Sequence, residues 1–185
     1  VYCLVKYLMK KNETVKKDKI IDKGYGTQPE EGLTLTGELN YPEGHKYDGD
    51  LKSEQEQIPH GYGKHVAANG NIHVGQWKNG KFDGEGTFST LADTNNEIHN
   101  YKGEWKENMK HGKGIYTWSD TRKYEGGFQD GKPHGQGTII EANGDEYVGA
   151  LKNGEMHGQG VMKYADGGEY DGDWSKDKQH GTGTL

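Results

Sequence analysis

The segment Tyr124–Glu146, which reads YEGGFQDGKPHGQGTIIEANGDE, contains the pattern that decides the fold. Tyr124, Gly126 and Phe128 alternate with other residues in the period of two that is typical of a β-strand with one occupied face. After the turn sequence QDGKPH, the two glycines of a G-x-G motif and Ile139 follow in the same period. The segment therefore predicts two antiparallel strands joined by a turn, with both glycines of G-x-G on the aromatic face.

The same pattern recurs along the chain at regular intervals. The leading residues of its six copies, numbered here as repeats one to six, are Tyr47, His73, Tyr101, Tyr124, Tyr147 and Tyr170. The last three steps are each 23 residues long, whereas the first two are 26 and 28. The extra residues, such as LADTNNEIHN before the third copy, are expected in loops. Matching residues at Gly37 and Tyr41 indicate a half unit before the first copy.

The composition of this 185-residue chain is unusual for a globular protein, because only 29% of its residues are hydrophobic and 31 are glycine. These values alone are typical of disorder, but 12 tyrosines and 4 tryptophans are not. We therefore expect the apolar area in a few large rings rather than in a broad aliphatic core. A single cysteine, Cys3, excludes a disulfide framework and a cysteine-based zinc site.

Three segments are predicted from charge and pattern. Residues 1–24 hold 7 lysines against 3 acids, which leaves 16 basic residues (23 − 7) against 26 acidic ones (29 − 3) in the rest of the chain. The apolar residues that recur in this first segment with the period of an amphipathic helix are Val1, Leu4, Val5, Leu8 and Met9. Such a helix could lie on an anionic membrane, dock on a partner or cap the first hairpin, and we favour docking or capping. Residues 25–46 are expected to form a linker with the half unit, and residues 47–185 about six units, the last one truncated.

The repeat resembles the MORN repeat (membrane occupation and recognition nexus), whose units run Y-x-G-x-W-x-x-G-x-x-H-G-x-G with a D-G turn. The resemblance covers residues 47–185 and implies an all-β fold, in which consecutive antiparallel hairpins form one elongated, twisted, single-layer sheet. The departures from the repeat are His73 for tyrosine, Leu51 and Leu151 for tryptophan, and Asp83 for histidine. MORN proteins similar to this chain include radial-spoke head proteins of cilia and cytoskeletal ring components of protists. Others carry the repeat beside a lipid kinase or a methyltransferase.

The histidines at each turn–glycine junction are the first candidates for chemistry. Equivalent positions in successive hairpins are expected ~10 Å apart, whereas a zinc ion needs all its histidine ligands within ~2.0–2.1 Å. Their repetition in every unit favours a role in the fold. The residues predicted to have such turn and strand roles are His111, His134, His157, Gly112, Gly114, Gly135, Gly137, Gly158 and Gly160.

Other catalytic patterns are weak. The stretches GQWKNGKF and GGFQDGKP contain the G-x-x-x-x-G-K of a phosphate-binding loop, but both lack the serine or threonine and the helix that must follow it. The chain has no G-x-S-x-G motif, and no histidine lies near the cysteine in sequence. We therefore expect no enzyme activity and no catalytic, cofactor-binding or metal-binding residues in this chain, and no nucleic-acid partner.

The aromatic face is the strongest candidate for binding, because a single-layer sheet has no second layer to cover it. Its rings could form the core or, where they are exposed, a groove for a partner helix or peptide, and both roles are expected for different rings. The candidate groove residues are Tyr101, Trp105, Tyr116, Trp118, Tyr124, Phe128, Tyr147, Tyr164, Tyr170 and Trp174.

Three functions remain open at this point. The first, which we favour, is a non-catalytic scaffold component of a large assembly in the cytoplasm, at the cytoskeleton or in a cilium. The second is a phospholipid-binding adaptor, but residues 47–185 carry 15 Lys and Arg against 22 Asp and Glu, a balance of −7, so only residues 1–24 could attract anionic lipid. The third is the regulatory module of an enzyme whose catalytic domain lies elsewhere. A homodimer through the sheet edge after Leu185 is also an expectation.

Overall fold

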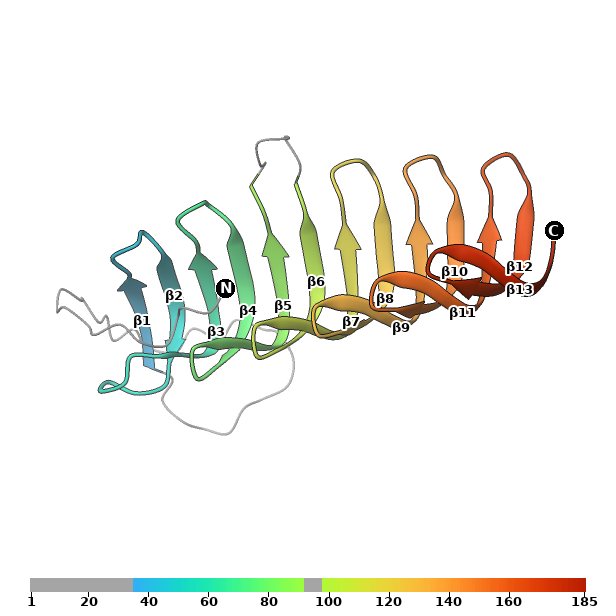
Figure 1. Ribbon diagram of the computed structural model, residues 1–185. Coiled ribbons are helices and arrows are strands. Elements are labelled where there is room, and N and C mark those ends of the chain that lie inside the picture. Colours follow the sequence, from blue (N-terminus) through green and yellow to red (C-terminus); the bar gives the residue numbers. More distant parts are fainter. Residues whose placement is uncertain (1–34, 92–97) are drawn as a thin grey trace, which may run out of the picture.

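A computed structural model describes residues 35–91 and 98–185 and shows one open, elongated β-sheet (Figure 1). Its 13 strands lie side by side in the order of the sequence, and each strand is antiparallel to the next. The described residues contain no helix. The predicted all-β, single-layer sheet of consecutive hairpins is confirmed. The helix predicted within residues 1–24 lies outside the described residues.

The even-numbered strands from β2 onward carry the leading aromatic residue of each repeat, and the odd-numbered strands from β3 onward carry the G-x-G motif. The strands are β1 (Leu35–Asn40), β2 (Lys46–Leu51), β3 (Pro59–Val66), β4 (Ile72–Lys78), β5 (Lys81–Ser89), β6 (Asn100–Lys106), β7 (Met109–Thr117), β8 (Lys123–Gln129), β9 (Lys132–Ile140), β10 (Glu146–Lys152), β11 (Glu155–Lys163), β12 (Glu169–Ser175) and β13 (Lys178–Thr184). β1 pairs with β2 from Leu35 to Asn40, so the sheet begins before the first full repeat.

The connections between strands form two rows, because consecutive antiparallel strands are joined at alternate ends (Figure 1). In the lower row, a two-residue turn follows each even-numbered strand from β4 to β12, and both of its residues have positive φ, such as +51° at Asn79 and +78° at Gly80. This is the type I′ geometry that matches the twist of the flanking strands. The second residue of each turn also donates its N–H to the preceding hairpin, for example from Gly131 to the Lys110 carbonyl at 3.0 Å.

The two glycines of the G-x-G motif have different structural roles. The first one has a left-handed φ, +59° at Gly112 and +79° at Gly135, and the strand register shifts beside it, so it lies in a β-bulge. The prediction that both glycines share the aromatic face is therefore wrong for the first glycine, which is favoured because of its backbone conformation. The second glycine does face the rings, since a Cβ on Gly114 would come within 2.5 Å of the Tyr101 hydroxyl oxygen.

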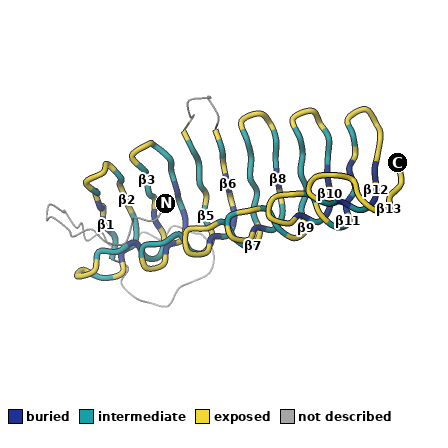
Figure 2. The backbone as a smooth tube through the Cα atoms, in the orientation of Figure 1, coloured by how far each residue is buried: buried dark blue, intermediate teal, exposed yellow. Residues whose placement is uncertain are grey.

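The core is a row of rings on one face of the sheet, which we call the aromatic face. The buried residues lie within the strands, whereas both rows of connections are mainly exposed (Figure 2). The leading tyrosine of each repeat packs over the glycine pair of its own hairpin and donates its hydroxyl to a backbone carbonyl three residues on, as Tyr147 does to Ala150 at 2.8 Å. The next ring along the strand packs edge-on against it, with 5.1 Å between the centroids of Tyr101 and Trp105. The paired glycines thus leave the space that each tyrosine ring fills.

Candidate functional site

The ten predicted groove residues divide by burial into seven buried core residues and three partly buried ones. The buried ones are Tyr101, Trp105, Tyr124, Phe128, Tyr147, Tyr170 and Trp174. The partly buried ones, which pack against this core, are Tyr116, Trp118 and Tyr164. Most of the rings are therefore occupied by packing within the sheet. We call Tyr116, Trp118 and Tyr164 the rim rings, because they combine contact with the core and access to solvent.

Two basic side chains lie over the rim rings of the third repeat. Trp118 packs edge-on against Tyr116, with 4.5 Å between ring centroids, and the Arg122 guanidinium lies over Trp118 at 5.1 Å. The Lys110 amine lies 4.1 Å from the centroid of the Tyr116 ring, and burial lowers the pKa of Lys110 below its usual range. Within the described residues Lys110 has no ion pair with a carboxylate. Arg122 is paired with Asp120 at 2.7 Å, so Lys110 is the cation without a carboxylate partner among the described residues of this part of the aromatic face.

His73 takes the place of the leading tyrosine in the second repeat and is almost fully buried, with 1% of its surface exposed. Its ring stacks on Phe82 at 3.5 Å between centroids and lies edge-on to Trp105 at 4.9 Å. Neither ring nitrogen has a hydrogen-bond partner among the described residues. Burial, with a smaller contribution from the charge of His65, lowers the pKa of His73 to about 3. The neutral imidazole therefore serves as an apolar ring here, and the break in the tyrosine series was the sequence signal for it.

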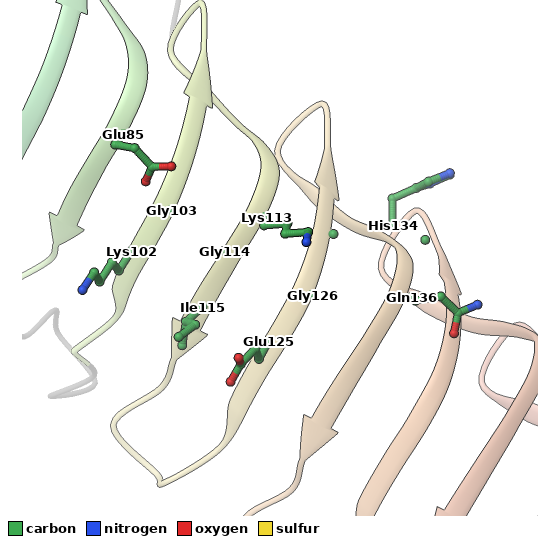
Figure 3. A pocket seen from close by; sticks show the side chains of 12 residues that line it. Glu85, Lys102, Gly103, Lys113, Gly114, Ile115, Glu125, Gly126, His134 and Gln136 are labelled. Carbon is green, nitrogen blue, oxygen red and sulfur yellow. The ribbon is translucent and has the colours of Figure 1, made fainter. Parts of the chain in front are cut away.

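The turn–glycine histidines are not brought together. The His60 ring accepts a long hydrogen bond from the Asn79 N–H, at 3.4 Å, but the described residues show no such bond from the rings of His111, His134 or His157. Figure 3 shows the His134 side chain extending away from the sheet. No group of three His, Cys, Asp or Glu residues in the described ranges could hold a metal ion. No described helix is long and apolar enough to cross a membrane.

A side-chain oxygen fills the β-bulge in four of the repeats. It belongs to the third residue after the leading aromatic residue, and it accepts the N–H of the residue between the two glycines of the G-x-G motif. These hydrogen bonds join Asp50 to Tyr62 N (2.7 Å), Gln76 to Glu85 N (2.9 Å), Glu104 to Lys113 N (2.9 Å) and Asp173 to Thr182 N (3.0 Å). The fourth and fifth repeats have Gly127 and Ala150 at this position. Sequence reasoning missed this acceptor, although a polar residue at that spacing was a readable signal.

Removal of one bulge acceptor should have a measurable cost. The Glu104→Ala substitution is expected to destabilise the chain by about 1 kcal/mol, because the Lys113 N–H loses its partner. For a chain of this length that corresponds to a decrease in melting temperature of roughly 2–4 °C, measurable by circular dichroism. The matched control is Glu169→Ala, an exposed acid for which the described residues show no hydrogen bond or ion pair. Equal melting temperatures for the two variants would contradict the assigned role.

A shallow cavity of about 680 Å³ lies beside the fourth repeat (Figure 3). It is lined by residues of β5 to β9, including Lys102, Glu125, Gly127 and Gln136. Lys102 and Glu125 alternate along their strands with the core tyrosines, so the cavity lies on the face opposite the aromatic face. The molecule therefore offers two distinct surfaces, the rim rings on one face and this cavity on the other.

The fold defines an elongated β-hairpin repeat protein with accessible surfaces on both faces of a single sheet. The model of the MORN repeat matches residues 58–72, 73–90, 101–121, 124–146, 147–169 and 170–185, which together make up more than half of the chain. The chain belongs to the MORN-repeat family, and the resemblance found in the sequence is confirmed. MORN repeats generally mediate interactions with proteins or membranes and are generally non-catalytic.

Known proteins are similar to this chain over part of their length. Alsin of Rattus norvegicus and alsin of Homo sapiens are each 32% identical to it over 84 residues, which cover 43% of this chain and 5% of alsin. The chain thus matches only a small part of these relatives. The TCP domain of SAS-4 from Drosophila melanogaster, solved with a proline-rich motif of Ana2, has a TM-score of 0.37 and 12% identity, over 80% of this chain and 84% of that chain. Similarity at this level does not bear on function.

Proposed function

We propose that this chain is a non-catalytic scaffold component of a larger protein assembly and binds a partner polypeptide through its rim rings. The observation that carries the proposal is the partial burial of Tyr116, Trp118 and Tyr164 against a continuous aromatic core. No second layer of described residues covers this face. Rings that are fixed in place by packing and still accessible lose little conformational entropy on binding, which makes them good anchors for a partner.

Charge favours a protein partner over a lipid surface. Residues 47–185 have a balance of −7, counted above, so the repeats are repelled by anionic lipid. Only residues 1–24 carry an excess of lysine, and they are the place where we propose any membrane contact. We propose a location in the cytoplasm, at the cytoskeleton or in a cilium, which the resemblance to scaffold members of the family suggests. Pairing of two copies through β13 is a further prediction, which light scattering can test.

The rim rings can be tested in cells with two matched variants. Trp118→Ser removes a rim ring, whereas Val148→Ser removes an apolar side chain that is 46% exposed and alternates with the core residues Tyr147 and Gly149. We expect the wild type and Val148→Ser to remain with the detergent-insoluble cytoskeletal fraction. Trp118→Ser should be largely released, because truncation of an aromatic anchor weakens binding by about 2 kcal/mol or more, roughly 30-fold.

Two results would count against the scaffold. Release of the wild-type protein by detergent would favour the membrane adaptor. Deletion of residues 1–24 provides the second measurement. If the remaining repeats still sediment with phosphoinositide vesicles at physiological salt, the lipid interaction lies in the repeats and the proposal is wrong.

A further inference from the structure

The bulge of the fourth repeat has an unoccupied position that four other repeats fill with a side-chain oxygen. Gly127 stands where Glu104 stands in the third repeat, so it supplies no acceptor. A Cβ on the bulge glycine Gly181 would lie 2.7 Å from the Asp173 carboxylate, but a Cβ on Gly135 would meet no atom within 4 Å. The space that the acceptor occupies elsewhere is therefore open here, and the cavity of about 680 Å³ lies over it.

In the filled bulges, the side-chain oxygen accepts the N–H of the residue between the two glycines. In the fourth repeat this residue is Gln136, which lies between Gly135 and Gly137. In the third repeat the same N–H, that of Lys113, is bonded to Glu104 at 2.9 Å. Among the described residues no side chain accepts the Gln136 N–H, and both Gln136 and Gly127 line the cavity. We propose that this open bulge binds a carboxylate side chain of a partner polypeptide, which accepts the Gln136 N–H in place of the missing acceptor.

The charges around the cavity suit a carboxylate. Lys102, Lys113, Glu85 and Glu125 line it, and Glu125 is already paired with Lys123 at 2.7 Å. Among the residues that line the cavity, this leaves two lysines against one glutamate, and the nearby Glu104 carboxylate is held by the Lys113 N–H in the neighbouring bulge. The Lys113 side chain extends from β7 toward β8 and the cavity (Figure 3). An incoming carboxylate therefore gains a charged neighbour as well as the backbone N–H.

The length of the cavity favours a polypeptide over a small anion. Its lining reaches from Glu85 on β5 to Gln136 on β9, which is four strand spacings, or roughly 19 Å. An extended peptide of about six residues covers this distance. The floor includes the backbone of Gly103, Gly114 and Gly126, which allows close approach. Because this surface is opposite the rim rings, the inference does not depend on the function proposed above.

The site can be tested by NMR on the 185-residue chain labelled with ¹⁵N. The probe is the peptide Ac-Ala-Ala-Glu-Ala-Ala-NH₂, and the matched control replaces its glutamate with leucine. We expect the glutamate peptide to shift the Gln136 amide in a saturable way, while the amides of Tyr62 and Thr182, whose bulges are filled and lie outside the cavity, stay unchanged. Inorganic phosphate and inositol trisphosphate are added separately to test for a phosphate or lipid-headgroup ligand.

Two variants locate the site. Gly127→Glu introduces the side chain found in the third repeat and should abolish the shift of the Gln136 amide. Because its Cβ would collide with the His134 carbonyl, the folding of this variant is checked first. Lys113→Glu changes an exposed side chain and should weaken the peptide about tenfold. The inference is overturned if the Gln136 amide does not respond, if the leucine peptide shifts it equally, or if Lys113→Glu binds as the wild type does. Tighter binding of phosphate or inositol trisphosphate than of the glutamate peptide also overturns it.

Discussion

Replacement of Gly149 by valine is expected to lower the melting temperature by roughly 6–12 °C, the shift for a cost of about 3 kcal/mol in a chain of this length. A Cβ at this position would lie 2.5 Å from both the Gly160 Cα and the Tyr147 hydroxyl oxygen. The paired strand holds the first atom, and burial of the ring holds the second, so neither can move away cheaply. Valine therefore destabilises the strand despite its higher β-propensity.

The control for this prediction is the same substitution at a glycine with more space. Gly168 lies in the connection before β12, and the nearest atom to its Cβ would be an Asp166 carboxylate oxygen at 3.2 Å. Gly168→Val should cost less than about 1 kcal/mol, because an exposed side chain can turn away. Thermal unfolding followed by circular dichroism compares the two variants. Equal melting temperatures would show that the glycine pairs are not needed for close packing.

Acidification is expected to destabilise the second repeat through His73. Burial lowers the pKa of this histidine from 6.5 to about 3, so the unfolded chain takes up a proton at a higher pH than the folded one. Stability is therefore complete above about pH 6.5 and decreases as the pH falls from there toward the folded-state pKa. The expected loss between pH 6.5 and pH 4.5 is about 2–3 kcal/mol from this residue. Denaturant unfolding at a series of pH values measures it.

The His73→Tyr variant isolates this contribution from that of every other titrating group. Tyrosine restores the leading residue of the repeat, and its hydroxyl is expected to reach the Gln76 carbonyl, as Tyr47 reaches the Asp50 carbonyl at 2.7 Å. The wild-type and variant stability curves should diverge below pH 6.5, with the variant less sensitive to acid. Parallel curves would mean that the burial of His73 does not couple folding to pH.

Much of the fold could be predicted, because the features that specify it are local. The alternation of Tyr124, Gly126 and Phe128 predicted strands, and turn pairs such as Asn153–Gly154 suit the positive φ values found there, +56° and +93°. The left-handed φ of Gly135 could not be predicted in the same way. A period of two assigns a face to each residue but does not reveal where a bulge interrupts the alternation.

The candidate site could be predicted less well, because it depends on burial and on distant neighbours. The aromatic spacing identified the rings but could not separate buried Tyr147 from half-buried Tyr164, since this depends on packing between hairpins. The cavity was not predicted at all, because it unites Glu85 with Gln136 across five strands. Its decisive feature is a missing side chain at Gly127, which is visible only beside the acceptors of the other repeats.

The bonds from each lower turn to the preceding hairpin give the array a direction. Asn108 donates to the Phe82 carbonyl at 2.9 Å, and Gly154 donates to the Pro133 carbonyl at 2.8 Å, always toward the N-terminus. A chain that emerges from the ribosome N-terminus first thus has each acceptor in place before the matching donor is synthesised. The sheet can grow by accretion, one hairpin at a time, because each new turn finds its backbone carbonyl acceptor already synthesised.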